Sequence, residues 1–213
     1  LPDVAIVNNV EFDHADIYPT LDAVRLAFRR FVNLVPRNGL LLLGADSQDA
    51  AGLQQHAVSP CETFGVDQPA DWEASDIDYR DGRTTFTVRR KGSVFGAFES
   101  PLLGVHNVRN ALAAMAAGVF VGLDAADVAE GLRTFKGIKR RLELVGTADG
   151  VDVLDDFAHH PTAVLETLTA LRTGYPGRRI WAVFEPRSAS SCRRDRKSTR
   201  LNSSHVALSR MPS

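Results

Sequence analysis

Short, wholly apolar segments separated by an amphipathic stretch most strongly restrict the fold of this chain. The runs VAIV (4–7) and LLLL (40–43) contain no polar residue, which is typical of strands buried on both faces of a parallel sheet. Between them, apolar residues recur at helical spacing from Leu21 to Val35, and Pro36 is expected to end the helix. This alternation predicts an α/β fold with a mostly parallel sheet.

The periodicity changes in the middle of the chain. After an expected helix at 47–57 and a third short strand at 61–66, residues 75–100 alternate between β-forming and polar types. The dipeptides Asp81-Gly82 and Lys91-Gly92 interrupt this alternation, and such dipeptides are typical of hairpin turns. We therefore predict a small antiparallel meander next to the parallel strands.

The chain then becomes helical and starts a second strand–helix–strand unit. Ala-rich residues 106–123 predict a helix, and Asp124 is expected to cap the following one. After Gly137, the strand at 151–157 leads into a helix with Pro161 near its first turn and then into another strand. This pattern predicts a truncated Rossmann-like α/β domain. We expect a central domain, this second domain and a tail, at residues 1–137, 138–194 and 195–213.

The tail is expected to be disordered and non-native. It has few large apolar residues and no helical or strand period. Its segment DRKSTRLNSSH resembles an accidental translation of a sequencing adapter, so we expect the natural sequence to stop near Arg194. The first residues form a strand without an initiator Met, so we expect the chain to be an internal fragment of a longer protein.

Composition excludes several partners. The chain has 213 residues, of which 44% are hydrophobic and 24% charged, with a net charge of −1, as expected for an ordinary globular protein. This balance gives no reason to expect nucleic acid or an anionic membrane as partner. No apolar run reaches the roughly 20 residues that span a bilayer. Cys61 and Cys192 lie far apart, which favours a reduced, cytoplasmic setting.

Polar residues crowd the turn after the first strand, in NNVEFDHADI. His14 lies among Glu11, Asp13 and Asp16, and open α/β sheets bind ligands at the carboxyl ends of their strands. Mg²⁺ prefers oxygen ligands and often takes only one or two from the protein, so a magnesium site is one interpretation. A helix-capping turn with incidental charge is the alternative.

Two further motifs lie at helix starts or domain junctions. In HNVRNALAA, Asn107 and Asn110 are three residues apart and share one helical face beside His106. Paired carboxamides offer donors and acceptors that suit a base edge, although an ordinary helix cap explains them as well. In KRRLE, Arg140 and Arg141 could clamp a phosphate or tie two domains together by ion pairs.

The last two motifs follow strands of the second domain. LDDFAHHPT places Asp155, Asp156, His159 and His160 between a strand and a helix. A zinc site is disfavoured because no further Cys or His has suitable spacing, so a polar ligand is the better interpretation. In FEPRS, Arg187 follows the next strand and could hold an anionic group.

Taken in order, five segments resemble the Mur ligase family, the ATP-dependent amide-forming enzymes of peptidoglycan synthesis. They are NNVEFDHADI, GVHNVRNALAA, GIKRRLELVG, DDFAHHPTAV and FEPRS, and the resemblance covers residues 1 to about 194. It implies part of the central ATPase domain followed by the start of the C-terminal domain, in a cytoplasmic ligase that uses ATP and Mg²⁺. The family's glycine-rich phosphate loop is absent, so we expect this chain alone to be inactive. Strands of the sheet are also missing, so an unpaired edge and apolar faces should make the chain poorly soluble.

The resemblance also implies roles for individual residues. His14 matches a histidine that helps to hold a second Mg²⁺ beside the γ-phosphate. The residues that match the nucleotide-binding positions are His106, Asn107 and Asn110 for adenine, Arg141 for phosphate or ribose, and Asp156 for ribose and domain closure. Three residues, His159, His160 and Arg187, fall where the substrate that carries the amine should lie.

Within the family, the pattern favours the members that join a murein tripeptide to UDP-N-acetylmuramate in peptidoglycan recycling. DHAD, FAHHPT and FEPRS stand where the L-alanine-adding members typically have a Met after Asp-His, Tyr-Gly, and Gln-Pro-His-Arg. L-alanine ligation is the alternative within the family. A nucleotide-binding module without catalysis, or a zinc hydrolase that uses His159 and His160, would be a different class of protein. The pattern does not indicate an oligomeric state.

Overall fold

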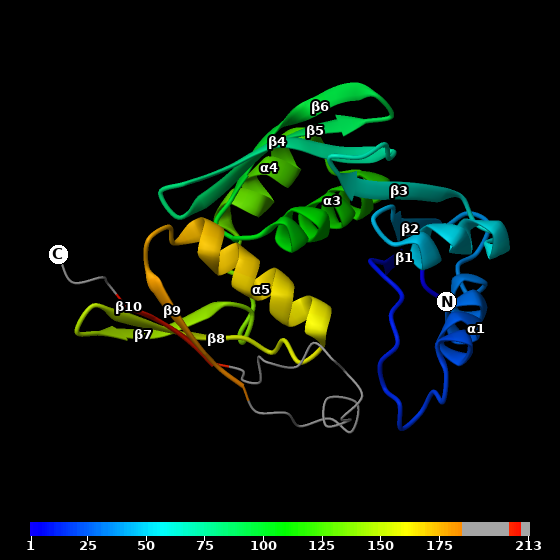
Figure 1. The fold of residues 1–213 in the computed structure, drawn as a ribbon. Helices are drawn as coiled ribbons and strands as arrows, with labels where there is room; N and C mark the ends of the chain where they lie inside the picture. Colours follow the sequence, from blue (N-terminus) through cyan, green and yellow to red (C-terminus); the bar gives the residue numbers. More distant parts are fainter. Residues whose placement is uncertain (185–204, 210–213) are drawn as a thin grey trace. The chain divides into compact units, whose positions relative to one another are not determined.

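The computed structural model describes residues 1–184 and 205–209, which form two compact units. The first unit comprises Leu1–Phe12 and Tyr18–Phe135, and the second comprises Asp13–Ile17 and the described residues from Lys136 onward. Each unit has its own sheet (Figure 1). The elements of the first unit, all labelled in Figure 1 except α2, are β1 (Val4–Val7), α1 (Leu21–Val32), β2 (Leu40–Gly44), α2 (Gln48–Ala51), β3 (Cys61–Val66), β4 (Trp72–Arg80), β5 (Arg83–Arg90), β6 (Ser93–Ser100), α3 (Val105–Phe120) and α4 (Ala125–Thr134).

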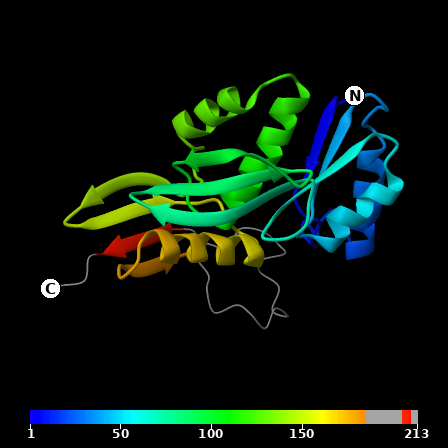
Figure 2. The ribbon, with the colours of Figure 1, turned by 90° about the horizontal axis from the view of Figure 1, so that it is seen from above.

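The first sheet confirms the predicted combination of parallel strands and a meander. Its order is β1-β2-β3-β4-β5-β6, with parallel pairing from β1 to β4 and antiparallel pairing from β4 to β6. Figure 2 shows the three meander strands running side by side. Asp81, Gly82, Lys91 and Gly92 all have positive φ, as a two-residue hairpin turn requires.

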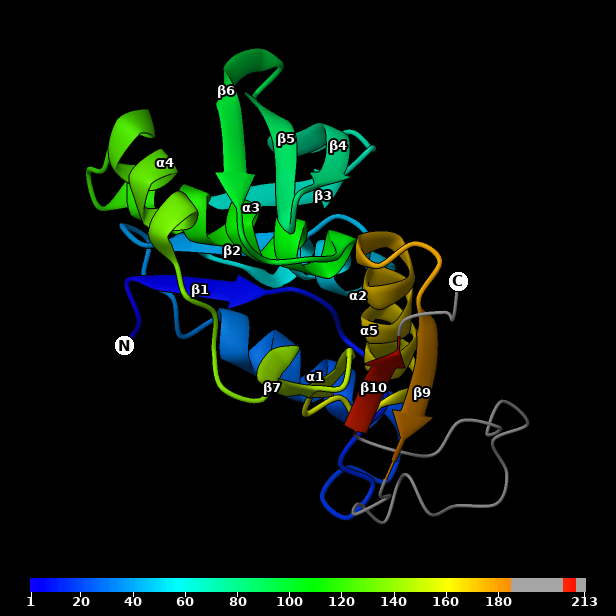
Figure 3. The same cartoon turned by 90° about the vertical axis from the view of Figure 1, so that its left-hand side faces the viewer.

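Strand β2 is buried because helices cover both faces of this sheet. Leu40 and Leu42 belong to the core formed with α3 and α4, whereas Leu41 and Leu43 belong to the core beneath α1. Figure 3 shows α1 and α3 on opposite sides of β1 and β2. The unbroken apolar run is therefore explained by two-sided burial, as we predicted from the sequence.

Helix α1 ends earlier than predicted. Thr20 caps its start, since the hydroxyl accepts from the N–H of Ala23 at 3.2 Å, but the helix stops at Val32 rather than at Pro36. Val35 leaves the helix and is fully buried, and residues before proline disfavour helical geometry. The expected cap of α4 is confirmed, because Asp124 accepts from the backbone of Asp127.

The second sheet has the order β7-β8-β10-β9 (Figure 1). Strands β8 and β9 run in the same direction, since both pair antiparallel with β10. Helix α5 starts at Pro161 as expected, and its Leu171 packs against Leu154 of β8. The elements are β7 (Glu143–Ala148), β8 (Val151–Asp155), α5 (Pro161–Gly174), β9 (Arg179–Val183) and β10 (His205–Ser209).

One expectation for the second unit was wrong. The expected disorder of residues 195–213 does not hold for His205–Ser209, whose backbone forms β10 because the facing edges of β8 and β9 supply hydrogen-bonding partners. The other tail residues lie outside the described ranges. The second unit also contains a hairpin that was not predicted, in which β7 and β8 are joined by Asp149 and Gly150, both with positive φ. Within the described ranges, no helix is long and apolar enough to span a membrane.

Candidate functional site

The start of α3 lies beside the end of β1, in the first unit. Asn8 follows β1, and its Nδ2 donates to Asn110 Oδ1 at 3.0 Å. Asn110 Nδ2 donates to Asn107 Oδ1 at 3.4 Å, and Asn107 Nδ2 donates to the Leu103 carbonyl at 2.8 Å. His106 is half-buried in the same first turn. The structure thus brings the predicted base-binding residues together and adds Asn8, which sequence reasoning missed.

A second tie holds the same helix end to β2. Arg109 Nε lies 2.6 Å from Asp46 Oδ2, and Asp46 also accepts from Gln68. Asp46 follows β2 and Gln68 follows β3. The carboxyl ends of three parallel strands are therefore joined to the N-terminal turns of α3, which is the edge where open α/β sheets bind ligands.

His14 lies in a constrained turn. Its φ is +51°, its N–H donates to Asp13 Oδ1 at 2.8 Å, and its carbonyl accepts from Ile17 at 2.8 Å. The imidazole is exposed on this fixed backbone. One such nitrogen fits a Mg²⁺ that takes most of its ligands from phosphate and water. Among the described residues, no three His, Cys, Asp or Glu side chains group as a metal site.

Asp156 organises the loops at the carboxyl end of β8. Its Oδ2 accepts from the N–H of Leu142 at 2.9 Å, and its Oδ1 accepts from the N–H of Ala158 at 2.8 Å and the Thr167 hydroxyl at 3.3 Å. The side chain is buried. Asp156 therefore holds the start of α5 and the segment at Leu142 in one arrangement.

Arg141 lies in the segment that Asp156 holds. Its neighbours Arg140 and Leu142 both have left-handed backbones, with φ of +60° and +51°. Such conformations persist only where surrounding contacts enforce them, and here Glu143 and Asp156 accept from the two backbone N–H groups. The guanidinium of Arg141 lies 5.8 Å from the ring centroid of Phe157.

The two predicted histidines precede α5. His159 Nδ1 lies 3.0 Å from the Phe157 carbonyl, and its Nε2 lies 3.6 Å from Asp13 Oδ2, also in the second unit. His160 occupies the N-cap position of α5. The described residues give these histidines no third ligand of the kind that a zinc site requires. Arg187 lies outside the described residues.

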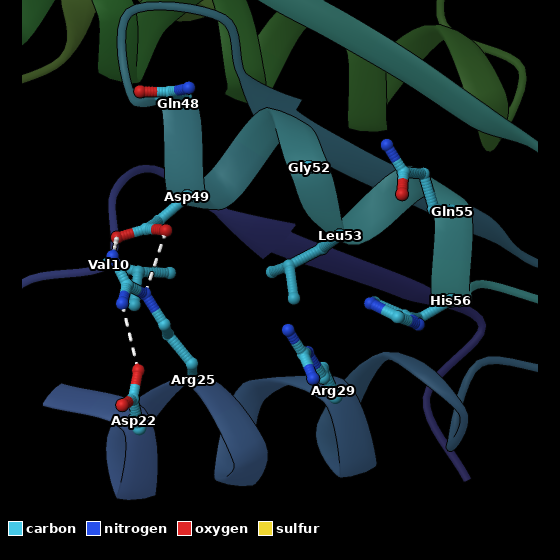
Figure 4. A pocket seen from close by; sticks show the side chains of 10 residues that line it. All are labelled: Val10, Asp22, Arg25, Arg29, Gln48, Asp49, Gly52, Leu53, Gln55 and His56. Atoms are coloured by element: carbon cyan, nitrogen blue, oxygen red, sulfur yellow. Dashed lines mark hydrogen bonds and ion pairs between the residues drawn. The ribbon is translucent and has the colours of Figure 1, made fainter.

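A groove between α1 and the α2–η1 segment contains none of the candidate site residues; η1 spans Gly52–His56. In Figure 4, Arg25 bridges Asp22 of α1 and Asp49 of α2. The three N···O distances are 2.9 Å. Arg29 and His56 line the same groove. Only the spacing of Asp22 and Arg25, three residues apart in a helix, is visible in the sequence. The groove is therefore best explained by the ion pairs that hold α2 to α1.

Comparison with known families identifies the two units. A model described as the Mur ligase middle domain matches residues 1–118, and one described as the Mur ligase, glutamate ligase domain matches residues 140–206. The two units are therefore α/β domains of an amide-forming ligase class. The chain belongs to the Mur ligase family.

Individual members of the family are similar to most of this chain. The chain is 42% identical to a UDP-N-acetylmuramate–L-alanine ligase of Chlorobium phaeovibrioides over 193 residues, which cover 90% of this chain and 41% of that protein. The solved UDP-N-acetylmuramate–alanine ligase of Thermotoga maritima has a TM-score of 0.73 at 26% identity, covering 87% of this chain and 41% of that one. The chain thus spans about two fifths of these relatives.

A tripeptide ligase is similar as well. The solved UDP-N-acetylmuramate:L-alanyl-γ-D-glutamyl-meso-diaminopimelate ligase of Neisseria meningitides has a TM-score of 0.56 at 35% identity, covering 65% of this chain and 42% of that one. Our preference for the tripeptide members is not confirmed, because the Chlorobium L-alanine ligase is more similar in sequence and aligns with more of the chain. The motifs that suggested the tripeptide members comprise only a few residues, whereas the alignment with the Chlorobium L-alanine ligase extends over 193 residues.

Proposed function

We propose that this chain is part of an ATP-dependent ligase that joins L-alanine to UDP-N-acetylmuramate. The observation that carries the nucleotide part is the carboxamide array of Asn8, Asn107 and Asn110 at the carboxyl edge of a parallel sheet. The similarity to L-alanine ligases along 90% of the chain supports the choice of substrates. His106 lies beside this array and belongs to the same proposed adenine site.

The chemistry we propose is carboxyl activation. The lactyl carboxylate attacks the γ-phosphorus of ATP and releases ADP. The amine of L-alanine then attacks the acyl phosphate, loses a proton and expels phosphate as the amide forms. Mg²⁺, when bound, supplies charge neutralisation on the transferring phosphoryl group. We assign His14 to hold it, because its imidazole is exposed on a fixed turn.

Residues of the second unit are proposed to complete the site. Arg141 is assigned to a phosphate or ribose of the nucleotide, since its planar guanidinium suits oxygen acceptors. Asp156 is assigned to domain closure over ATP, where its hydrogen bond to Leu142 sets the segment that carries Arg141. His159, His160 and Arg187 are assigned to the substrate that carries the amine, and the first two precede α5.

A second candidate is ligation of the murein tripeptide. It is favoured by the 35% identity to the Neisseria tripeptide ligase and by the motifs FAHHPT and FEPRS. Both candidates share the activation step and differ only in the amine that attacks. The choice between them therefore depends on the amine that the full-length enzyme uses.

The test is an amine competition in a full-length enzyme that carries this segment. With ATP and UDP-N-acetylmuramate, we expect the rate of amide formation with L-alanine to exceed that with tripeptide at least tenfold. The reverse preference would establish the tripeptide candidate. ATP binding without product from either amine would establish a module that does not catalyse. The matched variant His14→Ala should lower kcat and leave UDP-N-acetylmuramate binding unchanged.

A further inference from the structure

Asn8 begins a directional chain of three carboxamides. The nitrogen of Asn8 donates to Asn110, the nitrogen of Asn110 donates to Asn107, and the nitrogen of Asn107 donates to the Leu103 carbonyl. Each bond therefore runs from nitrogen to oxygen in the same sense. Asn8 and Asn110 are exposed, so the middle carboxamide is accessible to a ligand.

This chain of hydrogen bonds leaves one donor and one acceptor of the Asn110 carboxamide available to a ligand. A carboxamide carries two N–H donors and two oxygen lone pairs. One donor of Asn110 is directed to Asn107 and one lone pair to Asn8, so one donor and one acceptor remain. If the carboxamide turned by 180°, its NH₂ would face the NH₂ of Asn8. Asn8 and Asn107, whose own nitrogen donates to the Leu103 carbonyl, therefore together determine on which side of Asn110 the remaining donor and acceptor lie.

A fixed donor–acceptor pair distinguishes the purines. Adenine presents the N7 acceptor beside the N6 amino donor, whereas guanine presents two acceptors, N7 and O6, at the same edge. An asparagine pairs with both atoms of adenine, but its oxygen would face O6 of guanine. We propose that Asn8 is a positioning residue that fixes the carboxamide of Asn110 and so selects adenine over guanine nucleotides. This inference rests on the proposed binding of ATP at the start of α3.

The backbone of Asn8 is itself held by a close approach that only glycine permits. A Cβ at residue 44 would lie 2.0 Å from the Asn8 carbonyl oxygen and 3.0 Å from its carbonyl carbon. Gly44 ends β2, and two residues after Asn8 the N–H of Val10 donates to the Ser47 hydroxyl at 3.4 Å. The end of β1 is thus fixed against the end of β2, which places the Asn8 side chain at α3.

The experiment measures the ratio of ATP to GTP affinity in a full-length enzyme that carries this segment. The enzyme is titrated separately with each nucleotide, and the two dissociation constants are measured by isothermal titration calorimetry. We expect the original chain to bind ATP about tenfold more tightly than GTP, the scale of one bidentate contact. Asn8→Asp should reduce this ratio about tenfold, because a carboxylate only accepts and therefore draws the Asn110 NH₂ toward itself.

Matched variants separate orientation from general loosening. The added charge of Asn8→Asp repels ATP and GTP alike, so the ratio is insensitive to it. Arg109→Ala removes the ion pair between α3 and Asp46 but leaves the chain of carboxamide hydrogen bonds intact. This variant should bind both nucleotides more weakly, with an unchanged ratio of ATP to GTP affinity. Asn8→Ala and Gly44→Ala should each lower the ratio by a smaller factor than Asn8→Asp, since they free the carboxamide without reversing it.

Each outcome decides the matter. Absence of binding of both nucleotides to the original full-length enzyme would overturn the proposed nucleotide binding and this inference together. An ATP preference that stays unchanged in folded Asn8→Asp would overturn this inference and leave nucleotide binding intact. If Asn8→Asp does not fold, the decision rests on Asn8→Ala. Equal losses of ATP and GTP affinity in that variant would overturn the positioning role of Asn8.

Discussion

The two units use the same strand–helix–strand pattern but bury it differently. In the first unit, separate hydrophobic cores lie on the two faces of the sheet. In the described part of the second unit, the core consists of Leu154 and Leu171 on the face covered by α5. The opposite face leaves Val153, Trp181 and Val183 exposed. An apolar strand residue therefore joins a core only where a helix covers its own face of the sheet.

The largest expected effect tests this contrast between two tryptophans. Trp72 is fully buried, whereas 52% of Trp181 is exposed. Trp72→Ala should lower the free energy of unfolding of the first unit by about 3–5 kcal/mol through a cavity. Trp181→Ala should change that of the second unit by less than about 1 kcal/mol. Urea unfolding followed by circular dichroism measures both, and equal losses would refute the contrast.

The second prediction concerns the polar network of the second unit. Asp156→Ala leaves two backbone N–H groups without their acceptor and should cost about 2–3 kcal/mol. The amides of Leu142 and Ala158 should then exchange with solvent much faster. Asp155→Ala is the matched control, because its ion pair with Arg140 at 3.3 Å is partly exposed and is expected to contribute less than about 1 kcal/mol. Equal protection of Leu142 in the original chain and Asp156→Ala would contradict this role.

A smaller effect is expected where α2 is held to α1. Arg25 bridges Asp22 and Asp49 at partly exposed positions, so Arg25→Ala should cost about 1 kcal/mol of first-unit stability. Arg29→Ala, in the same groove, should cost less. Thermal unfolding of the two variants compares them directly. A greater loss from Arg29→Ala would show that packing rather than pairing holds this layer.

The smallest effect is a pH dependence of the first unit. Burial raises the pKa of Glu62, but hydrogen bonds from Lys91 and Trp72 outweigh it, so the pKa of this carboxyl lies below its ordinary value of 4.5. The charged form therefore stabilises the fold fully above pH 4.5, and this contribution is lost as the pH falls through the lowered pKa. Unfolding measured from pH 6 to pH 3 should show a smaller decline in Glu62→Gln. An identical decline would remove Glu62 as its source.

Local patterns predicted the first sheet well and long-range pairing poorly. The hairpin at Asp81 and Gly82 was predicted from its dipeptide, yet the equivalent signal at Asp149 and Gly150 was missed, because the strand at 151–157 was interpreted as the start of a new strand–helix–strand unit. Strand β10 could not be predicted, since its partners are the edges of β8 and β9 rather than its own neighbours in sequence.

The candidate site shows the same limit. Asn107 and Asn110 were recognised because their spacing places them on one helical face. Asn8 was missed because 102 residues separate it from Asn110, and only the folded sheet brings them together. The need for glycine at residue 44 was likewise not predicted, because it arises only from the close approach of the Asn8 carbonyl in the folded sheet. Residue types are visible in a sequence, whereas their partners depend on topology.

The burial of strand β2 on both faces limits the substitutions that this protein can accept during evolution. Every residue from Leu40 to Gly44 is buried, and successive leucines face different helices. A substitution on one face cannot be compensated by its neighbour in sequence, which already serves the other face. A compensating change must lie on the helix that packs against the same face, which is distant in sequence. An acceptable change in β2 therefore requires a second mutation in that helix. We therefore expect these five positions to tolerate the fewest amino acids in a saturation mutagenesis library.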